Sequence, residues 1–200
     1  MQEILNPWIA MEGYNCYGCC PSNPIGAHMR FYEEDAADVN GSIVCAWMPT
    51  QDHQSWINTL HGGMQATLLD EVCGWVVFKK LCTSGVTAKM DLKYKQAVST
   101  INGPLLLRAR LNSERHRVAV VEGELWMPKN KESIAKLTSW DVLADTCTLC
   151  TTCECTYFSF PADKAREMGF MEASLAEEQF TLQDIVRRAM QSASIRYRKL

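Results

Sequence analysis

Two adjacent carboxylates, Asp70 and Glu71, lie in the middle of the segment HGGMQATLLDEVCGW, which occupies residues 61–75. From Met64 to about Leu81 the chain lacks proline and carries apolar residues on nearly every side of a helix, which predicts a central, buried helix. An ionised carboxylate is rarely buried without a partner, because the loss of its water costs several kcal/mol or more. The pair therefore marks a candidate site for acid or base chemistry.

Gly62 and Gly63 stand at the start of the predicted helix. The first N–H groups of a helix have no intrahelical acceptor, and glycine adds no side chain that would keep another group away from them. Together with the positive end of the helix dipole, such amides can stabilise the oxyanion that forms when a carbonyl is attacked.

Asp70 follows Gly63 by seven residues and so lies on the same side of the helix, but roughly 10 Å away along the axis at about 1.5 Å per residue. A carboxylate at that distance cannot act on a carbonyl held at its own helix start. It can serve the helix start of a second, antiparallel copy, which predicts a two-fold homodimer. Glu71 is rotated by about 100° and is expected to be solvated or salt-bridged. A plain structural role, in which Asp70 or Glu71 pairs with a lysine or caps a loop, stays open.

The segments around this helix predict strands. Apolar and polar residues alternate from Val86 to Val98, with Val86, Ala88, Met90, Leu92 and Tyr94 on one face, which is typical of a half-buried strand. Further strands are expected at 28–34, 41–49, 105–112, 118–127 and 145–160, with 128–133 as a turn or a longer excursion. This order predicts an α+β domain, in which an antiparallel sheet packs on one long helix.

We expect residues 1–162 to form one domain, including a loop-rich N-terminal segment, residues 1–27, in which prolines and glycines break every period. Residues 163–200 have a charged, helical pattern and are expected to form an extension that lies on this domain or leaves it.

The composition argues against several classes of protein. A net charge of -3 gives no basic surface for nucleic acid. No stretch approaches the roughly 20 apolar residues that span a bilayer, and the first residues lack the cationic region of a signal peptide. We therefore expect a cytoplasmic protein that has neither nucleic acid nor a membrane as its partner.

The chain has ten cysteines. Cys16 and Cys19 form a C-x2-C pair with glycine in the turn, which is half of a zinc knuckle, whereas structural zinc requires four ligands. The only sequence candidates for a second half, the four cysteines within residues 147–155, lie in a predicted strand where residues three apart point to opposite faces. We therefore expect small buried strand residues there and no metal site.

The HGG-x6-D spacing of residues 61–70 resembles the hotdog-fold acyl-CoA thioesterases of the PaaI type. Upstream, CYGCCPSNPIGAHMRF is similar to the C-x-x-C-x-P-x-NP-x-G-L opening of many members, and PTQDHQSWINTLHGG is similar to their P-x-x-H-Q-G-x-x-G-x-x-HGG approach to the helix. Downstream, TYFSFPADKAREMG resembles their last strand and the turn after it. The resemblance runs from about Cys16 to Gly169, with a gap near residues 128–145.

This resemblance implies a hotdog fold, in which an antiparallel sheet wraps one long helix, and a homodimer or a dimer of dimers that hydrolyses acyl-CoA thioesters. It implies that the Gly62 amide, with Gly63 adjacent, binds the oxyanion. It implies that Asp70 of the other subunit acts as general base on water or as nucleophile. It also implies that a hydroxyl early in the strand after the helix, here Thr87, helps to hold the water. The chemistry requires neither a metal nor an organic cofactor.

The other candidate substrate-binding residues lie in the loop before the helix. His61 is expected to position this loop through a hydrogen bond rather than to transfer a proton, and His53 is a candidate lining residue of the pocket. Some members of the family place an asparagine six residues before the HGG histidine, where this chain has Ser55. The sequence does not single out the basic residues that bind the CoA phosphates.

Two other functions fit the same scaffold. A hotdog hydratase or dehydratase is marked by Asp-x4-His, and none of the four histidines has an aspartate five positions earlier. A non-catalytic acyl-CoA-binding protein has no need for a buried base, so Asp70 together with the glycines disfavours it. Two departures from the family bear on the shape of the pocket: KQAVST replaces the usual proline after the strand that follows the helix, and residues 128–145 exceed the usual hairpin.

Overall fold

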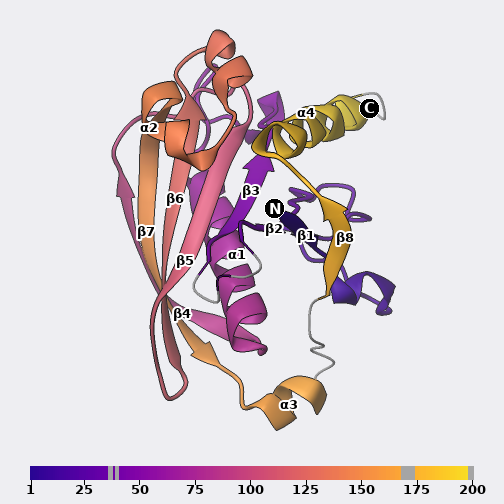
Figure 1. Cartoon of the computed structure of the whole chain (residues 1–200). Helices are drawn as coiled ribbons and strands as arrows, with labels where there is room; N and C mark the ends of the chain where they lie inside the picture. The colour runs from indigo at the N-terminus through magenta and orange to yellow at the C-terminus, as the bar shows by residue number, and fades with distance from the viewer. Residues whose placement is uncertain (36–37, 39–40, 168–173, 198–200) are drawn as a thin grey trace.

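One antiparallel sheet forms the frame of the protein (Figure 1). The computed structural model describes every residue except 36–37, 39–40, 168–173 and 198–200. Within this described part the sheet has eight strands in the spatial order β4-β7-β6-β5-β3-β2-β1-β8, and neighbouring strands run antiparallel. The strands are β1 (Gln2–Ile4), β2 (Tyr32–Glu33), β3 (Ile43–Trp47), β4 (Gly85–Tyr94), β5 (Leu105–Arg115), β6 (Val118–Pro128), β7 (Cys147–Ser159) and β8 (Leu175–Gln179).

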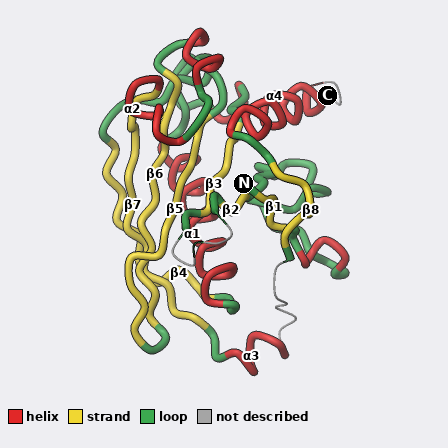
Figure 2. The backbone as a smooth tube through the Cα atoms, viewed as in Figure 1, coloured by secondary structure: helices red, strands yellow, loops and turns green. Residues whose placement is uncertain are grey.

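The long helix α1 (Gly62–Leu81) packs on this sheet, as the sequence predicts. Figure 2 shows it between the long strands and the strands of the N-terminal segment. The helix begins at Gly62, as predicted, where His61 caps it, and its last residue is Leu81, followed by Cys82, whose φ of 49° is left-handed. Apolar residues are buried along its whole length, which confirms the expected central position.

The middle of the sheet is covered on both faces. Cys45 and Trp47 of β3 belong to the core cluster that contains the residues of α1. Val44 and Leu106, which point the other way, belong to a second cluster that includes residues of helix α4 (Leu182–Tyr197). Where both faces are covered, strands lose the alternation of polar and apolar residues, which explains the run LLL at 105–107.

Residues 129–146 form an excursion of short helices rather than a tight turn. It contains η3 (Lys131–Lys136), η4 (Trp140–Val142) and α2 (Leu143–Thr146), which Figure 1 shows at one end of the sheet. Two further short 3-10 helices, η1 (Pro7–Ala10) and η2 (Gln51–His53), lie in the loops of the N-terminal third.

The described part of the C-terminal extension lies on the domain. It consists of α3 (Ala162–Glu167), β8 and α4, and β8 joins the sheet by pairing with β1 while α4 packs against β3. Neither β1 nor β8 is predicted by the sequence, because these short edge strands lack the alternation that marks a half-buried strand.

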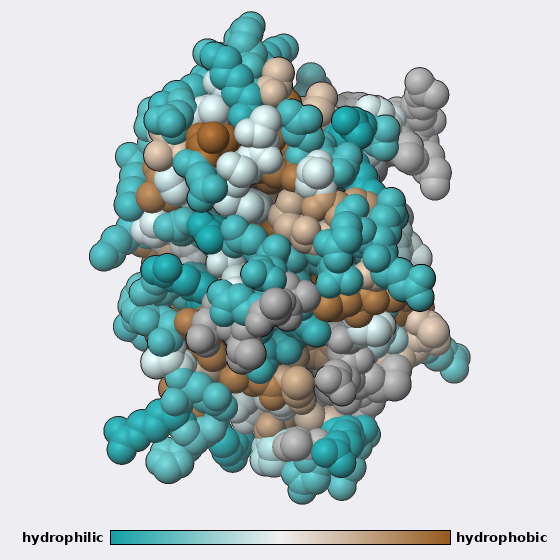
Figure 3. Space-filling view, viewed as in Figure 1, coloured by the Kyte–Doolittle hydropathy of each residue, from teal (hydrophilic) through white to brown (hydrophobic). Residues whose placement is uncertain are grey.

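The expected α+β class is confirmed, with β2 and β3 before the helix and β4 to β7 after it. The strand expected at 28–34 shrinks to the two residues of β2. None of the described helices has both the length and the apolar character needed to cross a membrane. On the face drawn in Figure 3, hydrophilic side chains predominate and apolar ones surface in smaller areas between them.

Candidate active site

Asp70 lies in the middle of α1, and two hydroxyl groups from the sheet hold its side chain. Thr87 Oγ1 on β4 donates to Asp70 Oδ1 at 2.8 Å. The Tyr157 hydroxyl on β7 lies 3.1 Å from the same Oδ1 and 2.8 Å from the main-chain oxygen of Asp70. Within the described part of the chain, Oδ2 accepts no hydrogen bond. One carboxylate oxygen is therefore fixed, while the other is available to accept a proton.

Thr87 reaches Asp70 because β4 contains a β-bulge. The register between β4 and β7 shifts between Thr87 and Lys89, which leaves Ala88 as the extra residue. Before the shift, Thr87 stands directly opposite Tyr157, so both hydroxyls meet the same carboxylate. The bulge thus assembles the pair of donors around Asp70.

The bulge also corrects the predicted alternation of this strand. Met90 and Leu92 pack against the core, as predicted. Before the bulge the two faces are exchanged relative to the prediction, so Thr87 turns towards α1 while Val86 is 54% exposed. Tyr94, also expected to face inward, is 53% exposed because it lies at the sheet edge and reaches the start of α1.

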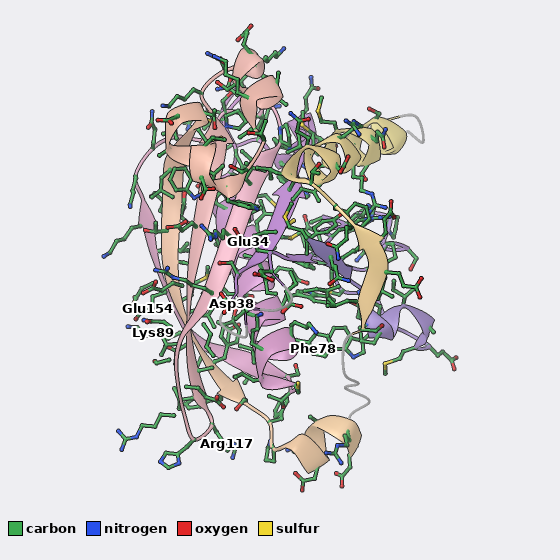
Figure 4. All side chains as sticks on the ribbon, viewed as in Figure 1. Glu34, Asp38, Phe78, Lys89, Arg117 and Glu154 are labelled. Atoms are coloured by element: carbon green, nitrogen blue, oxygen red, sulfur yellow. The ribbon has the colours of Figure 1, made fainter. Side chains whose placement is uncertain are left out.

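A cavity of about 510 Å³ opens beside Asp70. Asp70, Thr87 and Tyr157 line it from α1 and the sheet, and aromatic side chains of the N-terminal segment and of α1 line it from the other side. Trp8 packs on Phe78 with ring centroids 4.3 Å apart. Figure 4 places Phe78 on the side of α1 that faces the N-terminal segment, whereas Lys89 and Glu154 lie on the sheet side. The cavity is thus largely apolar with a carboxylate in its wall.

The start of α1 lies apart from this cavity. His61 Nδ1 accepts a hydrogen bond from the Gly63 amide at 2.9 Å, so the histidine caps the helix. The Gly62 amide finds no acceptor among the described residues, and the main-chain oxygen of Gly62 accepts from the Tyr94 hydroxyl at 3.1 Å. Of the two predicted oxyanion amides, only that of Gly62 therefore has no acceptor among the residues that the structure describes.

The two other predicted loop residues also lie outside the described lining of the cavity. The ring of His53 packs on Trp47 at a centroid distance of 4.7 Å, and its Nδ1 accepts from the Thr50 amide at 3.0 Å. Ser55 is exposed, and its amide donates to the main-chain oxygen of Thr59. Of the predicted site residues, a single chain therefore brings together Asp70 and Thr87 and leaves the others elsewhere.

Glu71 is half-buried and forms no salt bridge with a described residue, so the salt bridge expected as one of its two alternatives is not formed. Its carboxylate lies under the N-terminal segment, where the Trp75 indole N–H donates to it at 3.2 Å and Cys16 Sγ lies 3.7 Å away. No described lysine, arginine or histidine forms an ion pair with it. It lines the same cavity as Asp70.

Burial and close contacts shift the pKa values of this group. Burial first, and then the neighbouring Cys16, raises the pKa of Glu71 to about 7. The pKa of the Cys16 thiol is lowered to about 5, first by the hydrogen bond from the Cys19 thiol and then by the main-chain amides of Cys19 and Gly18. The pKa of Cys19 is raised, because it donates to Cys16 and is itself buried. The sequence did not predict this cluster.

The four cysteines of β7 are buried, as expected. Cys153 and Cys155 meet Cys73 of α1, with Sγ–Sγ distances of 3.8 Å from Cys153 to Cys73 and 3.7 Å from Cys153 to Cys155. They belong to a group separate from Cys16 and Cys19, so the two halves of a knuckle do not come together.

Known proteins share this architecture. Residues 57–134 match the family model described as the thioesterase superfamily. The chain superposes on the crystal structure of a thioesterase superfamily protein with a TM-score of 0.56 and 22% identity, over 72% of this chain and 59% of that one. It superposes on a Streptococcus mutans protein bound to acetyl CoA with a TM-score of 0.51 and 13% identity, over 76% and 96% of the two chains. No curated protein sequence matches the chain.

The matched residues run from the loop before α1 into η3, and so contain the helix, β4 to β6 and the predicted site residues except His53 and Ser55. An antiparallel sheet that wraps one long helix is the hotdog architecture, so the chain has the hotdog fold, and its residues 57–134 are similar to the thioesterase superfamily. The chain spans 59% of the length of the first structure to which it is similar.

Proposed function

We propose that the protein hydrolyses the thioester bond of an acyl-CoA, and that two copies of the chain are needed to complete each active site. The observation that carries this proposal is the carboxylate of Asp70, anchored at Oδ1 by Thr87 and Tyr157 and lining an apolar cavity. Acetyl CoA in the Streptococcus mutans protein of similar fold supports the choice of substrate class.

The reaction requires a polarised carbonyl and an activated water. Asp70 Oδ2 takes a proton from water, the water oxygen attacks the carbonyl carbon, and the carbon–sulfur bond then breaks as CoA leaves as a thiolate that is protonated afterwards. Direct attack by the same carboxylate, followed by hydrolysis of the resulting anhydride, uses the same oxygen. A positioned base contributes about 10²–10⁴ in rate and an oxyanion donor about 10²–10³.

The oxyanion donor in this proposal is the Gly62 amide of the partner. Within one chain, Gly62 lies eight residues before Asp70, which is about 12 Å along the helix at 1.5 Å per residue. β4 runs beside α1 in the opposite direction, so Tyr94 lies at Gly62 and Thr87 lies at Asp70. A two-fold axis near the middle of β4 therefore brings the Gly62 of each copy to the Asp70 of the other.

The edge of the sheet supports this pairing. β4 is a ten-residue edge strand that pairs only with β7 within the described chain, and a long unpaired edge favours pairing with another strand. Val86 and Tyr94 on β4 and Phe158 on β7 are each about half exposed, which gives this edge an apolar surface. A second copy of β4 covers both the edge and this surface.

Release of free thiol from a panel of aliphatic and aryl acyl-CoAs tests the function. We expect hydrolysis of at least one member and the loss of most turnover in Asp70→Asn, whose circular dichroism spectrum and melting temperature match the parent. Tight acyl-CoA binding without any thiol release would instead identify a binding protein, and full activity in Asp70→Asn would remove Asp70 from the mechanism.

A further inference from the structure

The N-terminal segment brings two thiols and a carboxylate together at the wall of the cavity. The Sγ atoms of Cys16 and Cys19 and a carboxylate oxygen of Glu71 all lie within 4.8 Å of one another. We propose that Cys16, Cys19 and Glu71 bind a divalent metal ion of the zinc type, with a water or a substrate group at its fourth position. This site is independent of the proposed thioesterase chemistry, and no step of that chemistry uses it.

The distances between the donor atoms fit such an ion. Cys16 Sγ lies 3.7 and 3.8 Å from the two carboxylate oxygens of Glu71. Zinc binds sulfur at about 2.3 Å and carboxylate oxygen at about 2.0–2.2 Å in a tetrahedron, which separates neighbouring donors by roughly 3.5–3.8 Å. Small movements of the side chains therefore suffice to enclose an ion.

The backbone between the two cysteines forms a turn, in which the Cys20 amide donates to the main-chain oxygen of Cys16 at 3.2 Å. The Cys19 thiol first, and then the main-chain amides of Cys19 and Gly18, lower the pKa of the Cys16 thiol. Gly18 is also required for the third ligand, because a Cβ atom at this position would lie 2.3 Å from Cδ of Glu71. The glycine therefore lets the helix carboxylate approach the two sulfurs.

The negative charge of the Glu71 carboxylate also favours a bound cation in this cluster. Glu71 is half-buried between the N-terminal segment and α1, where the Trp75 indole N–H donates to its carboxylate and Cys16 Sγ lies 3.7 Å from it. It has no ion-pair partner among the described residues. Withdrawing a carboxylate from water is costly unless it is paired or coordinates a metal, and a divalent ion would supply the missing positive charge.

The second thiol cluster of the chain, Cys73 with Cys153 and Cys155, does not share these features. All three residues are buried in the packed core, where thiols serve as small apolar side chains. Their group holds no carboxylate and does not line the cavity, whereas Cys16, Cys19 and Glu71 do. Of these two described groups, only the Cys16 cluster lines the cavity, through which an ion could enter and a fourth ligand could bind.

Titration of the reduced, metal-free full chain with Co²⁺ tests the proposal, because cobalt substitutes for zinc and reports its ligands spectroscopically. We expect one equivalent to produce a thiolate-to-cobalt charge-transfer band and the visible bands of a tetrahedral site, and Zn²⁺ to displace it. Binding of Zn²⁺ to the native state also raises the melting temperature by mass action, which gives a readout that does not depend on activity.

The variants assign the ligands. Cys16→Ser and Cys19→Ser are expected to abolish the charge-transfer band, and Glu71→Gln to weaken binding and alter the visible bands. Cys82→Ser, at an exposed cysteine, and Cys153→Ser, in the buried cluster, are expected to keep the parent spectrum. A chain that binds no Co²⁺, or that loses the band in Cys153→Ser and keeps it in Cys16→Ser, would overturn the proposal. So would an isolated chain in which Cys16 and Cys19 form a disulfide that persists under mild reduction.

Discussion

The Tyr157 hydroxyl lies 3.1 Å from Oδ1 and 2.8 Å from the main-chain oxygen of Asp70, so β7 and the middle of α1 are tied together at the proposed catalytic carboxylate. Thr87 donates to the same Oδ1 from the neighbouring strand. Two hydroxyls on one oxygen restrict the rotation of the side chain and hold Oδ2 in place.

We expect Tyr157→Phe and Thr87→Val each to lower kcat by about ten- to a hundredfold with little change in KM. A hydrogen bond to a charged group contributes about 1.5–3 kcal/mol, and here that contribution serves to orient the base. Steady-state kinetics on the best acyl-CoA of the panel measures the effect.

Thr156→Val is the matched control for both variants, because Thr156 is the neighbour of Tyr157 on the opposite face of β7. Its kcat should stay within about twofold of the parent. Equal losses in all three variants would mean that disturbance of the strand, and not the orientation of Asp70, lowers the activity.

The central helix could be predicted because its signals are local. The glycines at its start, the absence of proline and the apolar residues on nearly every side all lie within residues 61–81. The position of Asp70 relative to Gly62 follows from helix geometry alone. The sequence therefore predicts Asp70 and Gly62 as the candidate catalytic pair, without information on how the strands pair.

The role of Tyr157 could not be predicted, because it depends on strand pairing. Alternation along β4 places Thr87 on the outer face, and only the bulge at Ala88 turns it inward opposite Tyr157. A bulge is a property of two paired strands, β4 and β7, which are more than fifty residues apart in the sequence. The sequence of either strand alone therefore does not predict the bulge.

Glu71 was missed for a related reason. A rotation of about 100° from Asp70 takes it off the catalytic face, and the element that covers it is a loop with no period of its own. The one local signal is Trp75, four residues later on the same side of the helix, whose indole donates to the carboxylate.

Gly62→Pro removes the amide that we assign to the oxyanion while it leaves the helix start intact. Gly62 is the first helical residue, where proline is favoured, and His61 already has the extended conformation (φ -62°, ψ 136°) that a following proline requires. We expect kcat to fall by about 10²–10³, the value of one oxyanion donor.

Gly62→Ala separates the loss of the amide from the loss of glycine. It keeps the N–H group, and its Cβ atom would lie 3.7 Å from the Tyr94 ring, an ordinary contact. The alanine variant should retain far more activity than the proline variant. Equal activity in the two would show that the Gly62 amide takes no part in the reaction.

Mixing two inactive variants tests whether the site is shared between copies. In a mixed dimer of Asp70→Asn and Gly62→Pro chains, one site combines the intact Asp70 of one chain with the intact Gly62 of the other. Random reassembly makes about half of the dimers mixed, so we expect about a quarter of the parent activity. The assay requires joint refolding or co-expression, with the dimer verified by light scattering.

Each variant refolded alone is the control for this mixture and should stay inactive. If Asp70 and Gly62 acted within the same chain, every chain in the mixture would lack one of the two groups. The mixture would then be no more active than its parts, and a monomer in light scattering would contradict the shared site directly.

The last prediction concerns the buried ion pair that fixes the end of α1. Lys80 Nζ lies 2.6 Å from Glu33 Oε1, both side chains are 6% exposed, and Lys79 is more distant at 3.8 Å. Lys80→Met leaves the carboxylate of Glu33 buried with only this weaker partner. We expect the free energy of unfolding to fall by about 3 kcal/mol, measured by urea denaturation.

Two comparisons make this measurement specific to the buried pair. Arg110→Met breaks the exposed pair with Glu122, whose side chains are 66% and 39% exposed, and should cost less than about 1 kcal/mol. The double variant Glu33→Gln with Lys80→Met removes the buried charge that keeps only the weaker partner Lys79, and should recover part of the stability lost in Lys80→Met alone. If the double variant were less stable than Lys80→Met, the cost would lie in lost packing around Lys80 and not in the charge of Glu33.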